Sequence, residues 1–228
     1  MSTIVKNAPC FLFFELETVA LNGRKLAFDA TATTLKKKDI ELTFPMFVKS
    51  GLGSAPQYYM PKLMAAAGKP GAGTKLIEDE VNKVVFEGLK SADFDKGLDK
   101  LIAEAQNRDI RVFALSSLPQ EQAEALFAAH KLADKGVELY MADEIGEDFP
   151  RTETWLTLIR NMELEPRACI TLTSTRNACK GALTADMVGI ACPDEFTAFD
   201  DFSGAHFVLD SVADMKPAEL IDAVLLPA

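Results

Sequence analysis

The sequence predicts an α/β fold: a parallel β-sheet covered by helices, with an all-helical segment inserted after the first strand. Short apolar runs alternate with amphipathic helical patterns along most of the chain, whereas residues 23–90 show helical patterns and no convincing strand. The 228 residues, of which 48% are hydrophobic and 25% charged, exceed one typical domain and have an ordinary globular composition. We therefore expect an α/β core from residues 1–22 and 91–228, with residues 23–90 as a smaller helical domain.

The predicted strands are short apolar runs rich in residues that favour strands. They are Cys10–Phe14, Arg111–Leu115, Val137–Met141, Cys169–Leu172, Val188–Cys192 and His206–Leu209. Near-continuous apolar runs are typical of strands buried on both faces of a parallel sheet. Strands that alternate with helices form right-handed crossover units, which place helices on both sides of the sheet.

Helical spacing predicts the elements between these strands. One helix carries apolar residues from Phe94 to Ala105, and another has its apolar face from Trp155 to Met162. Between them, Ser117–Gln120 has the pattern of a capping box, with proline in the first turn of a helix that runs to about Ala133.

Two apolar stripes predict helices in the inserted segment. Their members are Met60, Leu63, Met64 and Ala67 in the first, and Leu76, Ile77, Val81, Val84, Val85 and Leu89 in the second. Because only two connections, near Gly23 and Ser91, join this segment to the core, we expect it to move as a unit.

Charge and cysteine content restrict the function. The net charge of −10 opposes general binding to nucleic acid or to an anionic membrane, but allows a small anionic ligand in a locally positive pocket. No apolar run is long enough to cross a bilayer, and Met1–Pro9 does not resemble a signal peptide. Four widely spaced cysteines are expected to be buried reduced thiols, and His130 and His206 have no partner at metal-ligand spacing. These features predict a cytoplasmic protein; they do not identify a protein partner.

Polar residues follow three of the predicted strands. Glu15 and Glu17 come after the first strand, Ser116 and Ser117 after the second, and the run Thr173–Asn177 after the fourth. Ligands of open parallel sheets bind outside the carboxyl ends of the strands. We therefore expect these side chains to share one edge, where they form either a site or a set of solvated helix caps.

Five segments together resemble the haloacid-dehalogenase-like (HAD-like) superfamily, nearest to its β-phosphoglucomutase and phosphatase branch with a helical cap. The segments are Phe13–Leu21, Gly97–Ser116, Phe149-Pro150, Cys169–Ile190 and Ala205–Ser211. The resemblance covers nearly the whole chain and implies a Rossmann-like core, with residues 23–90 as the cap.

The resemblance also implies roles for individual positions. Glu15 stands where the family has its nucleophilic Asp, and Glu17 where it has the Asp that acts as general acid and base. Ser116 keeps the family's phosphate-binding hydroxyl, with Ser117 beside it. Phe149 replaces the motif's Lys, a cation that Arg151 could supply instead. Thr173 and Ser174 replace the acidic pair that holds Mg²⁺.

These replacements favour a pseudoenzyme that binds a small ligand without catalysis. One extra methylene moves the attacking oxygen by roughly 1.5 Å, whereas productive attack tolerates about 0.5 Å. With Ser174 in place of a carboxylate at the family's metal position beside Glu15, no bound metal is expected. Two alternatives stay open: an active Mg²⁺-dependent phosphohydrolase or sugar-phosphate mutase that uses Glu15 and Glu17, and a protein-interaction module.

Overall fold

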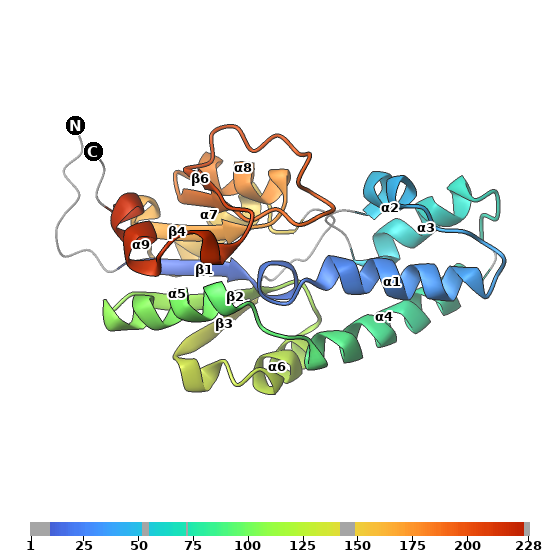
Figure 1. The fold of residues 1–228 in the computed structure, drawn as a ribbon, viewed down its shortest axis with the longest axis horizontal. Helices are drawn as coiled ribbons and strands as arrows, with labels where there is room; N and C mark the ends of the chain where they lie inside the picture. Colours follow the sequence, from blue (N-terminus) through green and yellow to red (C-terminus); the bar gives the residue numbers. More distant parts are fainter. Residues whose placement is uncertain (1–9, 52–54, 72, 142–148, 226–228) are drawn as a thin grey trace.

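A six-stranded, all-parallel sheet forms the centre of the protein (Figure 1). The computed structural model describes residues 10–51, 55–71, 73–141 and 149–225; Met1–Pro9 lie outside these ranges. The strands are β1 (Phe11–Glu15), β2 (Arg111–Ser116), β3 (Val137–Met141), β4 (Cys169–Thr173), β5 (Val188–Ala191) and β6 (Phe207–Val208). The predicted α/β class and all six predicted strands are confirmed.

The strand order β3-β2-β1-β4-β5-β6 puts β1 in the middle of the sheet. Phe14 of β1 lies opposite Ala114 of β2 and Leu172 of β4. The chain builds outward from β1 to β3, then returns to the other side of β1 to form β4. The order therefore reverses between β1 and β4, and this is where open α/β sheets bind ligands.

Helices cover both faces of the sheet. One apolar core contains residues of α5 (Lys96–Asn107), α6 (Gln120–Ala129) and α9 (Pro217–Leu225), and a second contains residues of α7 (Thr152–Asn161) and α8 (Arg176–Thr184). Strand β1 alternates between them, because successive side chains of a strand point to opposite faces. Leu12 and Phe14 join the first core, while Phe11 and Phe13 join the second.

Four helices form what we call the helical segment. They are α1 (Gly23–Lys36), α2 (Phe44–Gly51), α3 (Pro56–Ala66) and α4 (Thr74–Ser91). Figure 1 shows them extending from the carboxyl end of β1. Leu35, Phe47, Tyr59 and Leu63 belong to an apolar core of this segment. The division of the chain into two domains stays our prediction.

Two details of the predicted helices are wrong. Leu76 and Val84 of α4 are 77% and 50% exposed, because α4 buries a narrower stripe that includes Ile77 and Val81. The expected capping box does not form: α6 begins at Gln120 after Pro119 and ends at Ala129. The Ser117 hydroxyl instead donates a hydrogen bond to the carboxylate of Glu17, which lies 100 residues earlier in the sequence.

The loop after β5 anchors the helical segment to the α/β core. Phe196 from this loop is 1% exposed and belongs to the apolar core of the helical segment. Its ring centroid lies 5.1 Å from that of Phe44, and 5.5 Å from those of Phe28 and Phe47. Movement of the segment as a separate unit would expose this side chain, so the contact opposes the motion expected from the sequence.

None of the four cysteines, all in the described part of the chain, forms a disulfide with another; Cys169 and Cys179 are buried, whereas Cys10 and Cys192 are half-buried. Burial raises the pKa of Cys169 to about 12. No helix among the described residues has the length and apolar character needed to span a membrane.

Candidate functional site

The carboxyl ends of β1, β2 and β4 bring the polar strand ends together, as parallel neighbouring strands require. Glu15 is the last residue of β1, and Ser116 and Thr173 are the last residues of β2 and β4. Because β1 lies between the other two strands, carboxylates that follow it can reach hydroxyls on either side.

Glu17 reaches the β2 side. It lies in a π-helical turn, Leu16–Ala20, that directly follows β1. Its carboxylate accepts hydrogen bonds from the Ser116 hydroxyl, from the Ser117 backbone N–H at 3.1 Å and from the Ser117 hydroxyl at 3.3 Å. All three donors are uncharged, and no Lys, Arg or His in the described part of the chain forms an ion pair with Glu17. Burial raises the pKa of Glu17, and these hydrogen bonds oppose the rise.

Glu15 reaches the β4 side, across the point where the strand order reverses. Its carboxylate is 6% exposed and accepts hydrogen bonds from the Ser174 hydroxyl, the Thr18 hydroxyl and the Ser174 backbone N–H, the last at 3.2 Å. Burial raises the pKa of Glu15, while the charge of Arg24 and the hydrogen bonds oppose the rise. Thr173 is fully buried beneath this group.

Arg24, which the sequence reasoning missed, brings a buried cation to Glu15. It lies in the first turn of α1 and is 6% exposed. Its Nη2 lies 2.6 Å from the Ser174 hydroxyl oxygen, and its Nη1 forms an ion pair with Asp194 in the loop after β5. No local pattern marks Arg24, because its partners lie 150 and 170 residues further along the chain.

Gly23 fixes the position of Arg24. A Cβ atom at residue 23 would lie 2.5 Å from the carbonyl oxygen of Glu17, closer than side chains approach backbone. The start of α1 therefore packs directly against the turn that carries Glu17. This close approach sets the arginine over the carboxyl ends of the strands.

A cavity of about 130 Å³ lies between this polar group and the helical segment. Glu15, Glu17, Thr18, Arg24 and Ser117 contribute to its lining. Apolar side chains supply most of the remaining wall, among them Phe47, Val85, Phe86, Leu89, Leu118 and Phe149. The phenyl ring of Phe149 thus contributes an apolar wall where the resemblance predicts a lysine.

Arg151 does not join this group. Its side chain is 49% exposed, its Nε lies 3.6 Å from a carboxylate oxygen of Glu153, and it lines a separate surface hollow with Lys180. The reason is local: Arg151 directly precedes α7, and its side chain turns toward the exposed first turn of that helix. Arg24, and not Arg151, is the cation beside Glu15.

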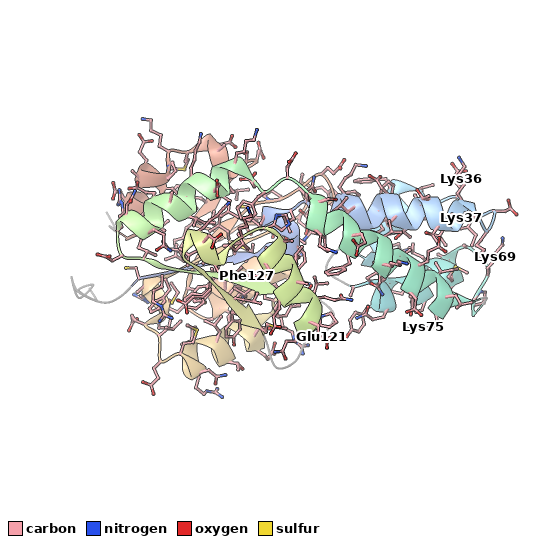
Figure 2. The ribbon with its side chains drawn as sticks, turned by 90° about the horizontal axis from the view of Figure 1, so that it is seen from below. Lys36, Lys37, Lys69, Lys75, Glu121 and Phe127 are labelled. Atoms are coloured by element: carbon pink, nitrogen blue, oxygen red, sulfur yellow. The ribbon has the colours of Figure 1, made fainter. Side chains whose placement is uncertain are left out.

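The cavity is not locally positive. Two carboxyl groups and one guanidinium line it, and no lysine of the described residues does so. Figure 2 shows Lys36, Lys37, Lys69 and Lys75 at the far end of the helical segment, away from the sheet. Among the described lining residues, Arg24 is the one cationic side chain, and it lies with two carboxyl groups.

No family model matches the chain, but individual proteins do. The CbbY proteins of Cereibacter sphaeroides and Rhodobacter capsulatus are 26% and 29% identical to it over 122 and 114 residues, which is 52% and 49% of this chain. These matches cover 53% and 50% of the two relatives, so the chain spans about half the length of the curated relatives it matches.

Solved structures match over almost the whole chain. CbbY from Rhodobacter sphaeroides in complex with xylulose-(1,5)bisphosphate is 19% identical, with a TM-score of 0.72 over 89% of this chain and 94% of that one. A β-phosphoglucomutase from Clostridium difficile is 15% identical, with a TM-score of 0.74 over 95% and 97% of the two chains. These similarities support the HAD-like superfamily, and within it the branch of β-phosphoglucomutases and phosphatases, as the sequence motifs predicted.

The raised pKa values of Glu15 and Glu17 predict how the stability of this HAD-like protein varies with pH. The pKa of Glu17 in the folded state is raised above its ordinary value of 4.5. At pH values between these two pKa values, the folded protein therefore binds more protons than the unfolded chain. The contribution of Glu17 to stability is present below the ordinary pKa and is lost as the pH rises through the raised pKa; the same holds for Glu15.

We therefore expect Glu17→Gln to flatten the decrease of melting temperature between pH 5 and pH 8. One titrating group changes the pH dependence of the free energy of unfolding by at most about 1.4 kcal/mol per pH unit. The matched control is Glu121→Gln, at an exposed position on α6 (Figure 2). Equal slopes for the two variants would contradict the assignment.

Proposed function

We propose that this protein is a catalytically impaired HAD-like protein, a pseudoenzyme that has lost phosphoryl transfer and keeps a cavity for a small ligand. The observation that carries the proposal is the position of Arg24. Its guanidinium lies against Ser174, at the residue position where the family resemblance expects a carboxylate that holds Mg²⁺.

The side chains around Glu15 do not fit a divalent cation. Mg²⁺ in proteins rests on one or two carboxylates and needs nearly octahedral oxygen ligands. Here Ser174 and Thr18 direct their hydroxyl hydrogens to Glu15, and a guanidinium already supplies a positive charge. No group of three His, Cys, Asp or Glu residues in the described ranges is placed to hold a metal ion.

The state of Glu15 also opposes its use as a nucleophile. Three hydrogen bonds engage its carboxylate, and the charge of Arg24 acts on it as well. A carboxylate held in this way must lose partners before it attacks. The longer Glu side chain adds the displacement expected from the sequence.

An active phosphohydrolase or mutase is the alternative, and its ligand would be anionic. Neighbours in this fold were solved with phosphate and with xylulose-(1,5)bisphosphate, and Arg24 is the cation that would meet such a ligand. That ligand would also face Glu15 and Glu17. Two carboxyl groups beside a single cation support the impaired form better.

The first test is hydrolysis. We expect turnover of p-nitrophenyl phosphate and of xylulose 1,5-bisphosphate to stay at background, with or without Mg²⁺, measured as released phosphate. Typical enzymes turn over at about 1 s⁻¹ or faster. Turnover in that range, abolished by Glu15→Gln, would make the phosphohydrolase reading correct.

The second test is metal binding. We expect millimolar Mg²⁺ to leave the melting temperature of the natural protein unchanged, because Arg24 already neutralises Glu15. A triple variant, Glu15→Asp with Ser174→Asp and Arg24→Ala, removes the guanidinium and adds a carboxylate. Saturation at about 100 times the dissociation constant adds about 2.7 kcal/mol, or about 5–11 °C for a chain of this size.

The double variant that retains Arg24 is the matched control. In it, the guanidinium would pair with the new carboxylate at position 174, so Mg²⁺ should produce no shift. A saturable Mg²⁺ shift in the natural protein that disappears in Glu15→Gln would refute the proposal.

A further inference from the structure

The size and walls of the cavity define what fits inside it. Its volume is about 130 Å³, close to engineered cavities of about 150 Å³ that bind benzene. A ligand of roughly six to eight non-hydrogen atoms fills such a space. Phe47, Phe86 and Phe149 contribute to a mainly apolar wall, which favours an apolar body.

The charges at the polar end of the cavity are unequally matched. Arg24 lies beside Glu15 and forms an ion pair with Asp194. Both of these carboxylates therefore have a cation next to them. The donors to Glu17 are all uncharged: Ser116, Ser117 and its own backbone N–H. Among the described residues, then, Glu17 is the carboxylate of the cavity without a positive partner.

Glu17 is half-buried at the cavity wall. A carboxylate that is partly removed from water and lacks a cation is costly when it is ionised, and a ligand that brings a positive charge lowers that cost. An anionic ligand would be repelled, because its negative charge would lie beside the Glu17 carboxylate. The amides of Asn82 and Gln122, which also line the cavity, offer further oxygen acceptors for an ammonium group.

We propose that the cavity binds a small organic amine, with its apolar body between Phe86 and Phe149 and its ammonium group on the Glu17 carboxylate. This inference rests on the proposed function, since a site that handled phosphate would need the opposite charge. It reverses the ligand charge expected from the family resemblance.

The experiment compares three probes by isothermal titration calorimetry on the full chain in metal-free buffer at pH 7.5. Benzylamine carries an ammonium group on an apolar ring, and benzyl alcohol has nearly the same shape without the charge. Inorganic phosphate is the third probe. We expect benzylamine to bind at least tenfold more tightly than benzyl alcohol, and phosphate to produce no heat and no competition.

Two variants locate the contact. Glu17→Gln should weaken benzylamine at least tenfold and leave benzyl alcohol within twofold, and the alcohol thereby reports that the cavity is still folded. Val85→Phe should fill the cavity and weaken both ligands. Equal affinities for amine and alcohol, an amine preference that survives Glu17→Gln, or displacement of benzylamine by phosphate would each overturn the inference.

The outcomes separate this inference from the proposed function. Hydrolysis of phosphate esters would refute the proposed function, and the amine inference with it. A catalytically silent protein that shows no preference for benzylamine would refute the amine inference alone.

Discussion

Phe196→Ala is expected to lower the free energy of unfolding by about 3–5 kcal/mol, or the melting temperature by about 6–20 °C. The side chain is 1% exposed and packs against Phe28, Phe44 and Phe47 of the helical segment. Its removal leaves a cavity inside that core and weakens the contact between the segment and the loop after β5. Thermal unfolding followed by circular dichroism measures the effect.

Phe199→Ala is the matched control, since Phe199 follows β5 in the same stretch of chain and is 59% exposed. Changes at exposed positions usually stay within about 0.5 kcal/mol. Hydrogen exchange should also show faster exchange in α1 and α2 for Phe196→Ala alone. Equal melting temperatures for the two variants would mean that Phe196 does not anchor the helical segment.

Arg24→Met is expected to cost a similar amount, about 3–5 kcal/mol, because it leaves buried carboxylates without their cation. The arginine and Asp194 side chains are 6% and 15% exposed, so solvent screens their ion pair weakly. Methionine retains most of the length and apolar surface of the arginine stem. The expected decrease in melting temperature is about 6–20 °C.

Two comparisons separate charge from packing in this prediction. Adding Asp194→Asn to Arg24→Met should recover part of the loss, because one of the unpaired carboxylates is then gone. Lys37→Met, which breaks the exposed pair between Lys37 and Glu80, should leave the melting temperature almost unchanged. If Arg24→Met behaves like Lys37→Met, the buried cation does not stabilise the site.

The order of secondary structure was predictable because it depends on local patterns. Apolar runs such as Phe11–Glu15 form strands wherever both faces are covered, and helical spacing located α5 and α7 within a few residues. The prediction was weaker at α6. The Ser117 hydroxyl, expected to cap this helix, donates a hydrogen bond to Glu17 instead. It was also weaker at α4. The predicted apolar stripe included Leu76 and Val84, but the neighbouring helices do not cover these two side chains.

Half of the candidate site was also predictable. Glu15 and Ser116 end parallel strands, and Glu17 and Ser174 come shortly after such strands. Topology alone brings the ends of these strands to one edge. Arg151 was expected there because of its position beside Phe149, but its side chain points to the surface of α7. A neighbour in the sequence need not share the direction of its side chain.

The six-stranded α/β core, the inserted helices and the polar strand ends were all predictable from local sequence patterns. The charge of the site was not, because it depends on contacts between distant segments. Arg24, Asp194 and Ser174 meet from three segments separated by up to 170 residues, and Phe196 enters a core formed by residues more than a hundred positions earlier. Local patterns carry propensity and periodicity, but an ion pair or a buried ring depends on where the folded backbone places both partners, and no local pattern specifies that.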